Sequence, residues 1–109
     1  MSASYSGRVY FGLQERDLNY ILQAIRRFPE VDEVILFGSR AKGNYKKGSD
    51  IDIALKGGRI NSSTISRISA LLNEESPLPY FFDILHYEKI ANKDLKEHID
   101  RVGVSLRLK

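Results

Sequence analysis

The feature that most constrains the fold of this chain is a pair of apolar segments separated by a long polar loop. Residues 31–37 are largely apolar or β-branched and end at Gly38, and residues 50–56 alternate apolar side chains with aspartate and alanine. Segments of this kind, bounded by glycine, predict two strands. The loop between them, residues 38–49, is longer than most connections in compact domains. Long ordered loops commonly carry function.

The rest of the chain predicts further strands and helices around this pair. Apolar residues at steps of three and four predict helices over residues 14–28, where Pro29 stops the helix, and over residues 61–75. We also expect a strand over residues 80–86, a short helix from residue 88 or 92 to 99, and a last strand over residues 102–108. This order predicts one α/β (α+β) domain over residues 1–109, a mixed β-sheet with helices packed on one face. Residues 1–12 are left unassigned.

Composition excludes several classes of protein. Hydrophobic residues make up 42% and charged residues 28% of the 109 residues, so we expect a folded core rather than disorder. The chain has no cysteine, which excludes disulfides and thiolate metal sites. No apolar run is long enough for a signal peptide or a membrane span, so the expected location is cytoplasmic.

Three aspartates form a candidate metal site. Alternate side chains of a strand point to one face about 7 Å apart, so Asp50 and Asp52 can share one divalent cation or bridge two. A pair of solvent-facing aspartates is the alternative. Asp83 lies in the apolar run Tyr80–His86, where we expect it to be buried, and a cation would remove the cost of burying its charge. Alternatively, Asp83 faces the open side of the sheet and meets a lysine.

The donors of this candidate site are all oxygens, which favours Mg²⁺ or Mn²⁺, as two ions about 3.5–4 Å apart. Such a site suits metal-assisted phosphoryl transfer. No Ser-His or Cys-His pair competes with it. His86 and His98 are interpreted as structural or surface residues, and Tyr80, Phe81 and Phe82 as core residues rather than a base-stacking platform.

The start of the polar loop is a candidate phosphate site. Gly38 allows close approach of the backbone, and Ser39 offers a hydroxyl and an amide at the start of a helical turn that Gly43 ends. Arg40 and Lys42 are interpreted as a clamp on a polyphosphate, although both can simply be solvated. The net charge is +3, and the basic residues Arg40, Lys42, Lys46 and Lys47 gather just before Asp50. Local positive charge suits an anionic substrate such as a nucleotide.

Gly38-Ser39 followed at a fixed distance by Asp50-x-Asp52 resembles the signature of the DNA polymerase β-type nucleotidyltransferase superfamily. The segments Gly-Ser-Arg-Ala-Lys-Gly and Gly-Ser-Asp-Ile-Asp-Ile-Ala are most similar to those of the minimal nucleotidyltransferases (MNT), over about residues 14–108. The resemblance implies that Ser39 binds the terminal phosphates of the nucleotide. It also implies that Asp50 and Asp52 hold the metals, and that Asp83 completes a metal site and helps to deprotonate the attacking hydroxyl.

The resemblance also implies a biological role. MNT proteins of this size are commonly the antitoxin of a toxin–antitoxin pair and transfer AMP from ATP to a tyrosine of a HEPN-domain ribonuclease encoded nearby. Two alternatives stay open: a binding module that neutralises its partner without catalysis, and nucleotidyl transfer to a small molecule such as an aminoglycoside. Nucleic-acid binding through the basic loop is less favoured. The sequence does not identify the acceptor, the number of nucleotides transferred, the base specificity or the homo- or hetero-oligomeric state.

Overall fold

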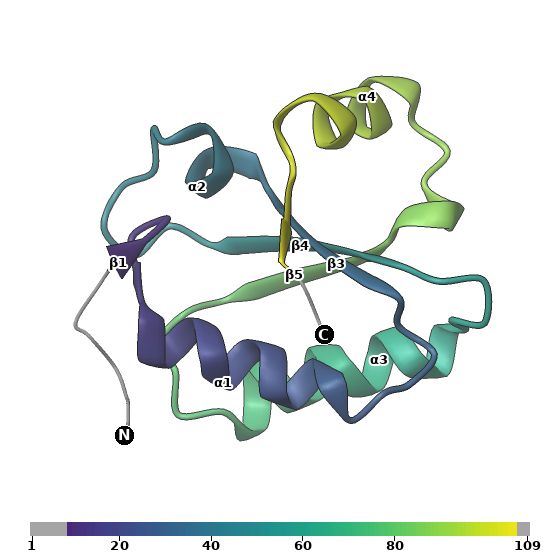
Figure 1. Ribbon diagram of the computed structural model, residues 1–109, viewed down its shortest axis with the longest axis horizontal. Helices are drawn as coiled ribbons and strands as arrows, with labels where there is room; N and C mark the ends of the chain where they lie inside the picture. The colour runs from purple at the N-terminus through teal and green to yellow at the C-terminus, as the bar shows by residue number, and fades with distance from the viewer. Residues whose placement is uncertain (1–8, 107–109) are drawn as a thin grey trace.

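The computed structural model describes residues 9–106 (Figure 1). Predictions for residues 1–8, and for Arg107, Leu108 and Lys109, lie outside the described residues. The elements along the chain are β1 (Val9–Tyr10), β2 (Leu13–Gln14), α1 (Glu15–Arg26), β3 (Glu33–Phe37), α2 (Gly38–Lys42), β4 (Ile51–Lys56), α3 (Ser62–Ala70), a π-helical segment Leu71–Glu75, β5 (Phe82–His86), a 3₁₀ turn Tyr87–Lys89, α4 (Lys93–Val102) and β6 (Val104–Leu106).

Four strands form the central sheet, in the order β5-β4-β3-β6. Strand β3 pairs antiparallel with both β4 and β6, whereas β4 and β5 are parallel. The predicted mixed sheet is therefore confirmed. Strand β1, at the end of the segment left unassigned, pairs with β2 in a small separate hairpin, and Leu13 of β2 is fully buried.

Both faces of the sheet are covered by helices, with α1 and α3 on one side and α2 and α4 on the other (Figure 1). The larger core lies under α1 and α3 and contains Val34, Leu36, Ile53 and Leu55. The alternate strand residues Ile35, Phe37 and Ala54 form a smaller core with Ile99 of α4. The expectation of helices on one face only is therefore wrong, because the chain after β5 crosses back over the second face.

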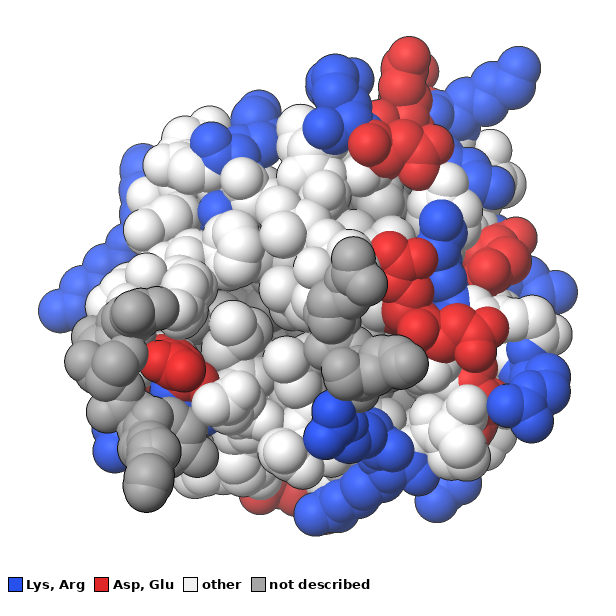
Figure 2. Space-filling view, viewed as in Figure 1, with Lys and Arg blue, Asp and Glu red and all other residues white. Residues whose placement is uncertain are grey.

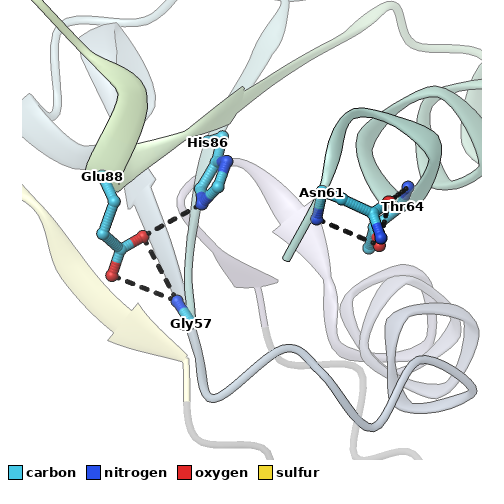
Figure 3. Close-up of polar contacts among 5 residues, drawn as sticks. All are labelled: Gly57, Asn61, Thr64, His86 and Glu88. Atoms are coloured by element: carbon cyan, nitrogen blue, oxygen red, sulfur yellow. Dashed lines mark hydrogen bonds and ion pairs between the residues drawn. The ribbon is translucent and has the colours of Figure 1, made fainter. Parts of the chain in front are cut away.

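Local sequence explains where the helices begin and end. Helix α1 buries Ile21, Ala24 and Ile25, and the chain leaves the helix just before Pro29. Asn61 caps α3 by accepting a hydrogen bond from the Thr64 amide at 3.0 Å (Figure 3). The π-helical segment continues α3 to Glu75, as the predicted helix over residues 61–75 requires.

A second polar cluster fixes the end of the sheet where β4 and β5 finish (Figure 3). Both oxygens of the Glu88 carboxylate accept from the Gly57 amide, at 3.3 and 3.2 Å, and His86 Nε2 lies 3.3 Å from Glu88 Oε1. Asp50 directly precedes β4 and Asp52 is its second residue. His86 lies at the far end of the neighbouring strand β5, which agrees with its interpretation as a structural residue. No helix within residues 9–106 has the length and apolarity to cross a bilayer.

Candidate active site

The register of the sheet brings the candidate residues together. Asp52 pairs with Phe37 of β3 on one side and with Asp83 of β5 on the other. Gly38 and Ser39 directly follow Phe37, so the polar turn begins beside the two aspartates. Asp52 and Asp83 alternate along their strands with the buried residues Ile51, Ile53, Phe82 and Ile84, and therefore face the side of the sheet that carries α2 and α4.

The carboxylates at this edge repel one another. Partial burial of Asp52 raises the pKa of its carboxyl above the ordinary value of 3.8, and the nearby charges of Asp83 and Asp50 raise it further. Asp50 and Asp83 are therefore close enough for their charges to act on the Asp52 carboxyl. Such repulsion is relieved when a cation binds, and raised pKa values of this kind are common at functional sites.

Asp83 differs from the prediction in one respect. It is exposed rather than buried, and it alternates with buried Phe82 and Ile84, while Phe81 is 59% exposed. The segment is therefore an edge strand with one buried and one exposed face. The sequence does not reveal this alternation, because the exposed residue Phe81 is itself apolar. The interpretation of Phe81 as a core residue is wrong, whereas that of Phe82 is confirmed.

Gly38 is required for its backbone angle and for its missing side chain. Its φ is 77°, a left-handed conformation that glycine adopts without strain. A Cβ atom at this position would overlap Oδ2 of Asp52 and lie 3.0 Å from its Cγ. The turn therefore passes directly against the Asp52 carboxylate, closer than any other residue type allows.

Helix α2 is the predicted helical turn. The Gly43 amide donates to the Ser39 carbonyl at 2.9 Å, and Gly43 ends the turn with a φ of 91°. Among the residues that the structure describes, the Ser39 hydroxyl makes no hydrogen bond. Ser39 itself is half-buried.

Arg40 does not fit the predicted role of a phosphate clamp. Its exposed fraction is only 3%, and its guanidinium donates to the main-chain carbonyls of Phe11 and Ser49. Lys42, Lys46 and Lys47 are exposed instead. Basic side chains gather over α2 and the loop after it, at the left of Figure 2, and these lysines remain candidates for contacts with an anion.

Asn73, in the π-helical segment, was not singled out by the sequence. Its side-chain amide donates to the Phe82 carbonyl at 2.9 Å and accepts from the Phe82 amide at 2.7 Å. It thus binds the outer edge of β5 one residue before Asp83. No local pattern marks this asparagine, because its partner lies on a different element.

His98 of α4 packs edge-on against Phe37, with ring centroids 6.2 Å apart.

The carboxylates suit a hard divalent cation because their donors are all oxygens and their charges repel. Within residues 9–106, however, no group of three acidic, histidine or cysteine side chains is gathered closely enough to hold a metal ion. A pocket of about 760 Å³ lies elsewhere, between α1 and residues 77–79, and none of the three aspartates lines it. Of the three aspartates, Asp50 and Asp83 are exposed and Asp52 is half-buried.

A glycine-serine turn against a row of carboxylates on a mixed sheet is the arrangement of a nucleotidyl-transfer domain. The family model described as "Polymerase beta, Nucleotidyltransferase" matches residues 19–108. The chain belongs to this family, as its motif predicts. A comparison with the curated proteins gave no significant match.

Solved structures with the same fold include toxin–antitoxin complexes. A chain of a toxin–antitoxin complex with AMP-PNP is 25% identical, with a TM-score of 0.66 over 80% of this chain and 69% of that one. A chain of the toxin–antitoxin MntA-HepT is 22% identical, with a TM-score of 0.64 over 84% and 70%. A chain from the complex of the tri-AMPylated Shewanella oneidensis HEPN toxin with its MNT antitoxin is 21% identical, with a TM-score of 0.57 over 84% and 66%. The fold is thus that of the MNT antitoxins.

Proposed function

We propose that this chain transfers AMP from ATP to a protein hydroxyl, a tyrosine of a HEPN-domain toxin, and so acts as the antitoxin of the pair. The observation that carries the proposal is the register that sets Asp52 between Phe37 and Asp83, with Gly38 and Ser39 directly beside them. Family membership supports nucleotidyl transfer, and the complexes with AMP-PNP and with an AMPylated HEPN toxin support the nucleotide and the partner.

In this reaction the acceptor oxygen attacks the α-phosphorus of ATP. A bond forms between that oxygen and phosphorus, the bond to the bridging oxygen breaks, and pyrophosphate leaves. In this proposal Asp83, which is exposed on the edge strand, accepts the proton of the hydroxyl. Ser39 and the backbone at Gly38 bind the terminal phosphates, and exposed Lys42 adds positive charge.

Asp50, Asp52 and Asp83 would hold Mg²⁺ or Mn²⁺, which when bound neutralises the polyphosphate and orients the reacting oxygens. Burial raises the pKa of Asp52, and the nearby charges of Asp83 and Asp50 raise it further, which supports this assignment. We expect nucleotide and metal to bind together.

The test is transfer of label from ATP carrying a radiolabelled α-phosphate, with Mg²⁺ and the HEPN protein encoded beside this chain. We expect label on the toxin with the intact chain and none with the Asp50→Asn/Asp52→Asn variant. Mapping the labelled residue then identifies the acceptor. A conservative control is Asp32→Asn, because Asp32 is an exposed aspartate ahead of β3, away from the site.

The same variant separates catalysis from neutralisation by binding. If Asp50→Asn/Asp52→Asn still suppresses the toxicity of the partner, AMP transfer is not the mechanism, and the chain is a binding module. If label goes only to an added aminoglycoside and never to a protein, the acceptor assignment is wrong although the transfer chemistry stands.

A further inference from the structure

Arg40 is a buried cation beside the candidate site. Its exposed fraction is 3%, although arginine is seldom so deeply buried without partners for its charge. Nε and Nη2 both donate to the Ser49 carbonyl, at 3.2 and 2.8 Å, and Nη1 donates to the Phe11 carbonyl at 2.8 Å. The planar guanidinium thus donates these three hydrogen bonds to main-chain carbonyl oxygens.

Two aromatic rings complete the surroundings of this guanidinium. Its carbon lies 5.4 Å from the ring centroid of Tyr45 and 5.2 Å from that of Tyr80, both within the range of a cation–π contact. Gly12 leaves room for this packing, because a Cβ there would lie 2.6 Å from the Tyr45 ring and 2.7 Å from Arg40 Nη1. Carbonyl oxygens and ring faces together stabilise the buried charge.

These contacts join four segments that are far apart in the sequence. Phe11 belongs to the turn of the N-terminal hairpin, Arg40 to α2, Tyr45 and Ser49 to the loop before β4, and Tyr80 to the segment that leads into β5. Three of these segments carry or adjoin candidate site residues. Arg40 directly follows Ser39, Ser49 directly precedes Asp50, and Tyr80 lies three residues before Asp83.

We propose that Arg40 is a positioning residue, which ties the loop of residues 43–50 to α2 and so fixes Asp50 relative to Ser39. Its effect on transfer rests on the proposed function, whereas its effect on the loop does not. Lysine cannot replace it, because one ammonium group lacks the planar fork that makes two bonds to one carbonyl while stacking between rings.

The test compares amide hydrogen exchange of residues 43–50 in the free protein and in the Arg40→Lys variant. We expect exchange of this loop to be faster by about tenfold or more, with the α1 amides as an internal measure of global stability. Arg67→Lys is the matched control, because Arg67 is an exposed arginine stacked 5.1 Å from the Phe28 ring on the other side of the molecule. The proposal would be overturned if the amide exchange rate of residues 43–50 is unchanged in Arg40→Lys. It would also be overturned if this rate rises equally in Arg67→Lys.

Tyr45→Leu provides a second variant if Arg40→Lys does not fold. Tyr45 is 37% exposed, so its removal disturbs the core less while taking away one ring face. We expect faster amide exchange in residues 43–50 of this variant too. Unchanged exchange would contradict the proposal that Arg40 holds this loop to α2.

Kinetics then connect the loop to the site. Positioning predicts that Arg40→Lys lowers kcat by about tenfold or more, with little change in KM for ATP. A raised KM with unchanged kcat would instead identify Arg40 as a direct phosphate ligand and overturn the positioning role. If the unaltered chain transfers no nucleotide at all, the proposed function fails, and the exchange experiment still decides whether Arg40 ties the loop.

Discussion

Replacing Gly38 by alanine tests the contact between the turn and the carboxylates. Two costs add at this position. A left-handed backbone, with φ of 77°, costs an alanine about 1–2 kcal/mol. The new Cβ would also overlap Asp52 Oδ2, and displacing a packed group of this kind costs about 1–3 kcal/mol more. We therefore expect Gly38→Ala to lower the free energy of unfolding by about 2–5 kcal/mol.

The structure provides a control that separates the two costs. Gly43 also has a left-handed φ, of 91°, but a Cβ there meets nothing within 4 Å. Gly43→Ala should therefore cost only the backbone strain, about 1–2 kcal/mol. Both variants should be unfolded in urea, alone and in an Asp52→Ala background. The comparison measures how much of the loss of unfolding free energy in Gly38→Ala is caused by the Asp52 carboxylate.

In the Asp52→Ala background the excess should largely disappear, because the overlapping atoms are gone. Equal costs for Gly38→Ala and Gly43→Ala, or an excess that persists without the Asp52 carboxylate, would refute the close approach. Without that close approach, the turn would not hold Ser39 at a fixed position relative to the Asp52 carboxylate.

Three further predictions concern the same edge of the sheet. The raised pKa of Asp52 means that its protonated form stabilises the fold below the ordinary value of 3.8, and that this contribution is lost as pH rises through the raised pKa. Asp52→Asn should therefore raise Tm at pH 7–8 in the absence of metal, and a lower Tm would contradict the raised pKa that burial and the neighbouring charges cause. Mg²⁺ with a nonhydrolysable ATP analogue should raise Tm of the unaltered chain at neutral pH and leave that of Asp52→Asn unchanged; equal shifts would place the nucleotide elsewhere. Asn73→Ala should cost about 1–3 kcal/mol in urea unfolding, because it leaves the main-chain groups of buried Phe82 without partners, and undiminished stability would show that water replaces the amide.

The strands and the motif were predictable because their signals are local. Alternation in residues 50–56 fixed which side chains share a face, and Gly38 and Gly43 marked the limits of the turn. The structure confirms β3, β4, α1 and the helical segment to Glu75 within a few residues. Local periodicity is enough wherever one face of an element is buried.

The positions of Arg40, Asp83 and Asn73 were not predictable in the same way, because their surroundings come from distant segments. The sequence predicts Arg40 as a clamp on a polyphosphate, yet its side chain is buried beside a hairpin turn and two tyrosines. Asp83 looked buried in an apolar run, yet it lies on an exposed edge strand. Burial of a charged residue depends on tertiary contacts that no spacing within one segment encodes.

The most direct test of the central claim is which phosphate of ATP is transferred. The chain should be incubated with the proposed HEPN partner and Mg²⁺, once with ATP labelled at the α-phosphate and once with ATP labelled at the γ-phosphate. Nucleotidyl transfer at the edge formed by Ser39, Asp50, Asp52 and Asp83 predicts label on the partner from the α-phosphate only, lost with Asp50→Asn/Asp52→Asn. Label from the γ-phosphate, or α-label that persists without these carboxylates, would contradict the account.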